Sequence, residues 1–98
     1  MSGESTSGGE AVAALLEIRN RRGLHARAAA KFVKTAAEFE ADVEVERGEY
    51  KVCGQSIMGL MMLAAAQGTT IQVSARGPQA GQALAALKDL VDRKFDED

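Results

Sequence analysis

The hydrophobic pattern of this chain switches between two periods, and this switching restricts its fold more than any other feature. Residues 42–46 alternate Val with acidic residues, which is typical of a strand that buries one face. Residues 26–39 carry apolar side chains three and four positions apart, which is typical of one face of a helix. A chain with both patterns must pack helices against a sheet.

The same reading predicts a strand–helix–strand–strand–helix–strand–helix order. The predicted strands are 12–19, 42–46, 50–53 and 70–75, and the predicted helices are 26–39, 57–66 and 80 to about 95. Short strands interrupted by helices favour an α+β fold, with one antiparallel sheet and the helices on one of its faces. The other face is expected to be solvated, because the acidic residues of 42–46 alternate onto it.

Length and composition exclude several classes of protein. The 98 residues suffice for one domain, expected over 11–98, with the Gly-, Ser- and Glu-rich residues 1–10 as a disordered tail. The net charge of −2 argues against nucleic acid as the main partner, and no apolar run is long enough for membrane insertion. One Cys and one His cannot complete a zinc site, so we expect no metal and no cofactor. A single Cys also fits a cytoplasmic location.

The segment NRRGLHARAAA, residues 20–30, contains the most informative candidate site. His25 stands immediately before the predicted helix, at its N-cap. Unpaired backbone N–H groups and the partial positive charge of a helix N-terminus can hold an anion there. Arg27 lies in the first turn, where its guanidinium can reach the same anion.

Two interpretations of His25 follow from the residues themselves. A neutral imidazole is a good nucleophile near pH 7 and can accept a phosphoryl group on a ring nitrogen. The helix N-terminus would then hold the transferred anion. A polar N-cap in a surface turn accounts for the same position, and from position alone it is the commoner case.

The predicted helix 57–66 is apolar on nearly all sides, and Ser56 is placed to cap it. A short helix on a small sheet can bury only one face. We expect Leu60 and Leu63 in the core. Ile57, Met58 and Met61 are expected to face out at a docking surface, where Met adapts to several partners. The alternative is that all of these side chains are buried.

Two motifs together resemble the HPr family, the histidine-containing phosphocarriers of the phosphoenolpyruvate-dependent phosphotransferase system. GLHAR followed by an Ala-rich helix is similar to the family's active-site pattern GLHxRPA. GQSIMGLMML, residues 54–63, resembles the family's regulatory-serine helix, and AAQGTTIQVSARG fits the strand that follows. The resemblance covers residues 15–91. It implies an open-faced β-sandwich with a four-stranded antiparallel sheet and three helices on one face, in agreement with the order predicted from periodicity.

The resemblance also implies roles for particular residues. His25 would be phosphorylated, as a pros-phosphohistidine, with Arg27 as its charge partner. Enzyme I would be the phosphoryl donor and Enzyme IIA proteins the acceptors, so that the chain is a covalent carrier and not an independent enzyme. Ser56 matches the serine that an HPr kinase/phosphorylase modifies in some branches. The expected docking residues are Leu24, Ile57, Met58 and Met61.

One position departs from the family pattern, and one alternative function stays open. Ala28 stands where the family has Pro, which lacks an N–H and presets the first helical turn. The alternative function is a regulatory docking module of the same fold that acts through Ser56 without phosphoryl relay. The intact His25–Arg27 pair favours the relay. The sequence does not separate the sugar-transporting branch from the nitrogen-regulatory branch.

Three smaller expectations concern the oligomeric state, Cys53 and the acidic C-terminal residues. A carrier that docks transiently is expected to be a monomer. Cys53 is expected to be a small buried hydrophobe. The acidic run of residues 96–98 is expected to be a solvated tail.

Overall fold

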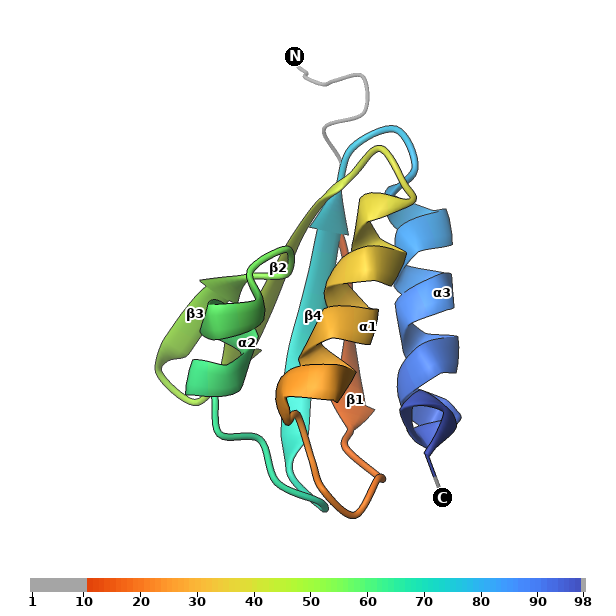
Figure 1. Ribbon diagram of the computed structural model, residues 1–98. Coiled ribbons are helices and arrows are strands. Elements are labelled where there is room, and N and C mark those ends of the chain that lie inside the picture. Colours follow the sequence, from red (N-terminus) through yellow and green to blue (C-terminus); the bar gives the residue numbers. More distant parts are fainter. Residues whose placement is uncertain (1–10, 98) are drawn as a thin grey trace.

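The computed structural model describes residues 11–97 and consists of a four-stranded sheet with three helices on one side (Figure 1). The elements are β1 (Ala11–Glu17), α1 (Ala26–Ala37), β2 (Asp42–Arg47), β3 (Tyr50–Cys53), α2 (Ile57–Met62), β4 (Thr70–Arg76), α3 (Ala80–Asp92) and the 3₁₀ turn η2 (Lys94–Asp96). This confirms the predicted fold class and element order. The tail expected at 1–10 lies outside the described residues.

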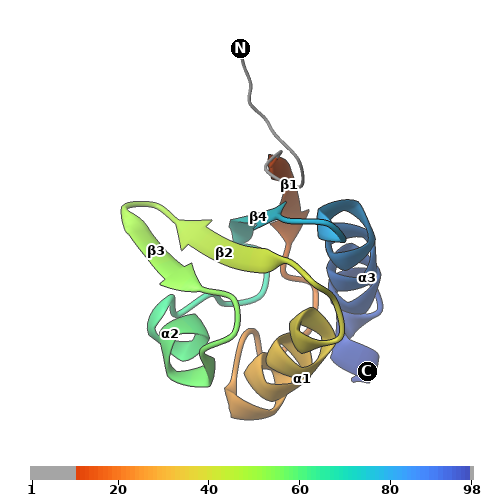
Figure 2. The ribbon, with the colours of Figure 1, turned by 90° about the horizontal axis from the view of Figure 1, so that it is seen from above.

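The sheet has the strand order β1-β4-β2-β3, and every neighbouring pair is antiparallel. The view from above shows all three helices on the same face (Figure 2). In β2, Val43 and Val45 are buried under them while Asp42 and Glu44 are exposed. The strict alternation of this strand therefore sets which face of the sheet becomes the core.

The core is aliphatic, with Phe32 of α1 and Phe95 of η2 as its two largest fully buried side chains. Each such burial contributes roughly 1.5–3 kcal/mol. Helix α1 turns small residues toward the sheet, including Ala28, which is fully buried. The position at which this chain departs from the family pattern is thus part of the core. Among the described residues, no helix combines the length and the apolar character that crossing a bilayer requires.

Helix α2 is shorter than predicted, because it ends at Met62 and not near residue 66. Ala64 takes a left-handed φ of 51°, which no helix can continue. The chain then turns Ala65 inward, where its carbonyl accepts a 2.9 Å hydrogen bond from the Leu24 N–H. The segment that periodicity assigned to the helix instead supports the loop before α1.

Helix α3 is also shorter than predicted and ends at Asp92. Three consecutive residues then have positive φ: Lys94 at 61°, Phe95 at 55° and Asp96 at 61°. Each left-handed residue other than Gly costs about 1–2 kcal/mol, and the burial of Phe95 offsets part of this cost. A periodic apolar pattern does not encode such a reversal.

The expectation that Cys53 is buried is wrong. Its thiol is free and exposed on the edge strand β3. The neighbouring Val52 packs against the core, and successive side chains of a strand point to opposite faces.

Gly23 holds the loop before α1, and its replacement should destabilise the fold. Its φ is +68°, and a Cβ would lie 2.4 Å from the Ala65 carbonyl oxygen. Gly48 has a similar φ of +61° but nothing within 4 Å, so it is the matched control. We expect Gly48→Ala to lower the free energy of unfolding by about 1–2 kcal/mol and Gly23→Ala by at least about 3 kcal/mol, measured by urea denaturation. Equal losses would contradict this account of the loop.

Candidate functional site

His25 is the N-cap of α1, as the sequence predicts. Its backbone is extended (φ −75°, ψ 178°), and its carbonyl accepts the Ala29 N–H at 2.8 Å. Its ring Nδ1 faces the helix N-terminus and accepts the Arg27 N–H at 3.3 Å. An acceptor nitrogen carries no proton, so this geometry places the lone pair of Nδ1 toward the helix.

The loop before His25 is closed by the side chain of Asn20, which is fully buried. Asn20 Nδ2 donates to the Gly23 carbonyl at 2.8 Å, and the Gly23 N–H donates back to the Asn20 carbonyl at 3.2 Å. The left-handed Gly23 makes this reversal sterically accessible. His25 therefore enters the helix from a loop whose conformation is fixed by a buried amide.

Glu97 contacts the opposite edge of the imidazole. His25 Nε2 is paired with Glu97 Oε2, and Asn20 Nδ2 donates to Glu97 Oε1 at 3.0 Å. The side chains of His25 and Glu97 are only 18% and 17% exposed. The acidic run was expected to be a solvated tail, which is wrong for Glu97, although Asp96 is exposed and Asp98 lies outside the described residues.

Competing effects act on the pKa of Glu97. Burial of the carboxyl raises its pKa, but the hydrogen bonds from Asn20 and His25 and the charge of Arg22 together hold the pKa below its ordinary value. Glu97 is therefore ionised near neutral pH. An ionised carboxylate only accepts hydrogen bonds, so the proton between the two groups lies on Nε2 of His25.

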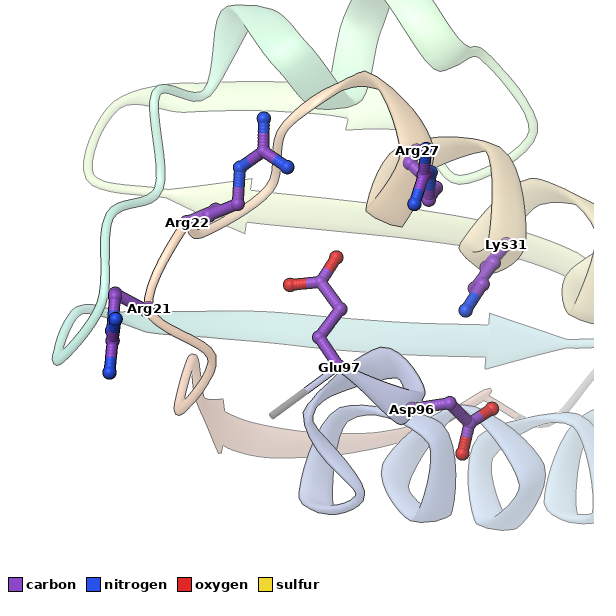
Figure 3. A pocket seen from close by; sticks show the side chains of 6 residues that line it. All are labelled: Arg21, Arg22, Arg27, Lys31, Asp96 and Glu97. Atoms are coloured by element: carbon purple, nitrogen blue, oxygen red, sulfur yellow. The ribbon is translucent and has the colours of Figure 1, made fainter.

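A basic pocket of about 380 Å³ is lined in part by Glu97, the partner of His25 Nε2 (Figure 3). The Glu97 carboxylate extends into it, among cationic side chains from the loop and from α1. Lys31 Nζ also donates to the Phe95 carbonyl at 2.7 Å, which ties α1 to the C-terminal turn. Such a cluster can hold a group with several negative charges. Its lining residues are Arg21, Arg22, Arg27, Lys31, Asp96 and Glu97.

Ser56 caps α2, as predicted. Its Oγ accepts the Gly59 N–H at 2.9 Å, and the side chain is half-buried. Helix α2 lies beside α1 in both ribbon views (Figures 1 and 2), so the fold brings the helices that follow Ser56 and His25 together on one face of the sheet.

The apolar side chains of α2 divide between core and solvent. Leu60 and Leu63 are buried, as expected. The exposed set is Ile57 (41%), Met58 (72%), Met61 (41%) and Met62 (73%). Leu24 does not belong to this set, because it is only 5% exposed and packs in the core. The expectation that Leu24 is a docking residue is therefore wrong, because its side chain is not exposed to a partner.

Glu97, Asn20 and Lys31 are among the site residues that sequence reasoning missed. Glu97 is 72 positions from His25, and only the fold brings the two together. No local pattern marks an acidic residue near a chain end as a partner of the loop. Asn20 carried a weak signal, because it is a polar residue at the start of the motif segment.

Three comparisons with known proteins agree on one family. A family model described as the PTS HPr component phosphorylation site matches residues 12–93. Phosphocarrier protein HPr of Neisseria meningitidis is 49% identical over 82 residues, covering 84% of this chain and 92% of that protein. Phosphocarrier protein NPr of Shewanella violacea is 46% identical over 80 residues, covering 82% and 88%. The crystal structure of HPr-C-His from Thermoanaerobacter tengcongensis has a TM-score of 0.85 and 44% identity, covering 89% of this chain and 98% of that one.

Proposed function

The chain belongs to the HPr family of phosphotransferase-system phosphocarriers, and on this premise we propose that His25 accepts a phosphoryl group from an Enzyme I protein and passes it to Enzyme IIA proteins. One observation carries the assignment to His25. Its Nδ1 accepts the Arg27 N–H at the N-cap of α1, and its Nε2 is paired with Glu97, which lines a pocket together with four cationic side chains. The phosphoryl group would form a pros-phosphohistidine at Nδ1.

The transfer needs no added base. The lone pair of Nδ1 attacks phosphorus, the donor's bond to phosphorus breaks, and the electron pair of that bond stays on the donor. The Arg27 N–H, now 3.3 Å from Nδ1, would turn to a phosphoryl oxygen, and the Arg27 guanidinium would pair with the added charge. The chain is modified and discharged in each cycle, so it acts as a covalent carrier and not as an independent catalyst.

Partner docking would use the exposed apolar side chains Ile57, Met58 and Met61 beside the site. Such a patch next to a charged pocket suits proteins that bind transiently and release. For the same reason we propose a monomer, which sedimentation equilibrium would test against a dimer. A cytoplasmic location belongs to the same proposal, and fractionation of the source cells would test it.

A second function rests on Ser56. A kinase/phosphorylase would place a phosphate at the cap of α2, directly beside the exposed Ile57 and Met58. The added negative charge would oppose docking at this patch. A regulatory docking module that acts through Ser56 alone is the alternative to the relay. The pairing of His25 with Arg27 in a basic setting favours the relay, since a pure regulator would not need it.

The direct test of the relay is intact mass spectrometry after incubation with an Enzyme I and phosphoenolpyruvate. We expect one phosphate adduct that is stable in alkali and lost in acid, as for a phosphoramidate. His25→Ala, checked for native folding by circular dichroism, should give no adduct. An adduct that persists in His25→Ala, or none on the wild-type chain with several Enzyme I proteins, would refute the proposal.

Ser56→Asp tests the regulatory role. Asp still caps a helix, so the free energy of unfolding should change by less than about 1 kcal/mol. Its charge should nevertheless slow phosphoryl uptake by about tenfold, mainly through a higher KM. Ser56→Asn is the uncharged capping control and should react at the wild-type rate. If Ser56→Asp and Ser56→Asn react equally fast, charge at this position does not regulate docking.

A further inference from the structure

The C-terminal turn has an unusual backbone that ends in one contact. Three consecutive residues, none of them Gly, have left-handed φ values between 55° and 61°. The turn is held by the buried side chain of Phe95 and by Lys31 Nζ, which donates to the Phe95 carbonyl. A conformation of this cost persists only where its surroundings fix it, and such conformations gather at functional sites. The turn places the Glu97 carboxylate in contact with His25 Nε2.

The carboxylate is held from its other side as well. Asn20 Nδ2 donates both to the Gly23 carbonyl at 2.8 Å and to Glu97 Oε1 at 3.0 Å. The Gly23 carbonyl fixes the orientation of this amide, because a flipped Asn20 would turn its oxygen toward the carbonyl oxygen of Gly23. One buried side chain thus sets both the loop and the direction in which Glu97 presents its second oxygen.

We propose that Glu97 is a positioning residue for phosphoryl transfer: held by Asn20, its carboxylate keeps the ring proton of His25 on Nε2 and so presents Nδ1 as the free nucleophile. This inference rests on the proposed function of His25. Glu97 does not touch the transferred group in this account, since it contacts the ring edge opposite Nδ1. It acts only through the tautomer and the orientation of the imidazole.

The placement of the proton matters in both directions of transfer. During uptake, the Nδ1 lone pair forms the new bond to phosphorus while the donor keeps the electrons of the broken bond. The ring then carries a positive charge, which the Glu97 carboxylate offsets. During donation, the P–Nδ1 bond breaks and its electron pair returns to Nδ1. The leaving group is a neutral imidazole because Nε2 still holds its proton, whereas a ring without that proton would have to leave as an imidazolate.

The fixed Asn20 amide makes one substitution unusually informative. In Glu97→Gln the new amide must place its oxygen toward Asn20 Nδ2, because two NH₂ groups cannot face each other. Its NH₂ group then faces His25 Nε2 as a donor, which favours the tautomer with the proton on Nδ1. Glu97→Ala only removes the hydrogen-bond partner of His25 Nε2, so the ring can exchange between its two tautomers. The isosteric variant should therefore be more harmful than the truncated one.

The test uses the full chain uniformly labelled with ¹⁵N, in wild-type form and as Glu97→Gln, Glu97→Ala and Asp92→Asn. Asp92→Asn is the matched control, because Asp92 is an exposed carboxylate of α3 that is bonded to Lys88 and does not line the pocket. Two readouts are taken: the tautomer of the His25 ring from its ¹⁵N shifts without any donor present, and the steady-state kinetics of uptake from Enzyme I and phosphoenolpyruvate. We expect Glu97→Gln to move the ring toward the Nδ1–H tautomer and to lower kcat by about tenfold or more with little change in KM.

The controls make the outcomes decisive. Asp92→Asn should stay within about twofold of wild type, and Glu97→Ala should lie between wild type and Glu97→Gln. The inference fails if Glu97→Gln keeps the wild-type tautomer and rate, or if Glu97→Ala is as slow as Glu97→Gln with an unchanged tautomer. Because the ring measurement needs no donor, a wild-type chain that never takes up phosphoryl but shows the Glu97-dependent tautomer would refute the proposed function and leave the contact established.

Discussion

The rest of the site depends on the two hydrogen bonds that the side-chain amide of Asn20 donates. This amide joins the loop before α1 to the last described residue of the chain, through one hydrogen bond to the Gly23 carbonyl and one to Glu97. Both bonds are donated by Nδ2 of a fully buried side chain, whose Oδ1 has no hydrogen-bond partner among the described residues. His25 is therefore held between a helix N-terminus on one ring nitrogen and a carboxylate on the other.

The architecture supplies these two supports from opposite ends of the sequence. Strand β1 and helix α1 are joined by the His25 loop, whose Leu24 N–H is anchored on the Ala65 carbonyl after α2. Helix α3 runs along the same face of the sheet and ends in the turn that carries Glu97 (Figure 1). Burial of Phe95 locks that turn to the core. The site is thus only as rigid as the packing of the C-terminal segment beneath it.

The sequence predicted what local patterns encode and missed what only the tertiary fold decides. The period of two in β2 and the helical spacing in α1 gave the sheet and its covered face, and the cap position of His25 followed from the start of α1. The ends of α2 and α3 could not be predicted in this way, because Ala64 and the residues of η2 take left-handed conformations that apolar periodicity does not mark. Glu97 was assigned to solvent for the same reason, since its role depends on that reversal.

The measurement that tests this account most directly is the identification of the phosphorylated nitrogen. The ¹⁵N-labelled chain, charged by Enzyme I and phosphoenolpyruvate, would be examined for scalar coupling between phosphorus and the two ring nitrogens of His25. The account predicts coupling to Nδ1, with the proton retained on Nε2 beside Glu97. Coupling of phosphorus to Nε2 would contradict the account, because Nε2 is the nitrogen that is hydrogen-bonded to the Glu97 carboxylate.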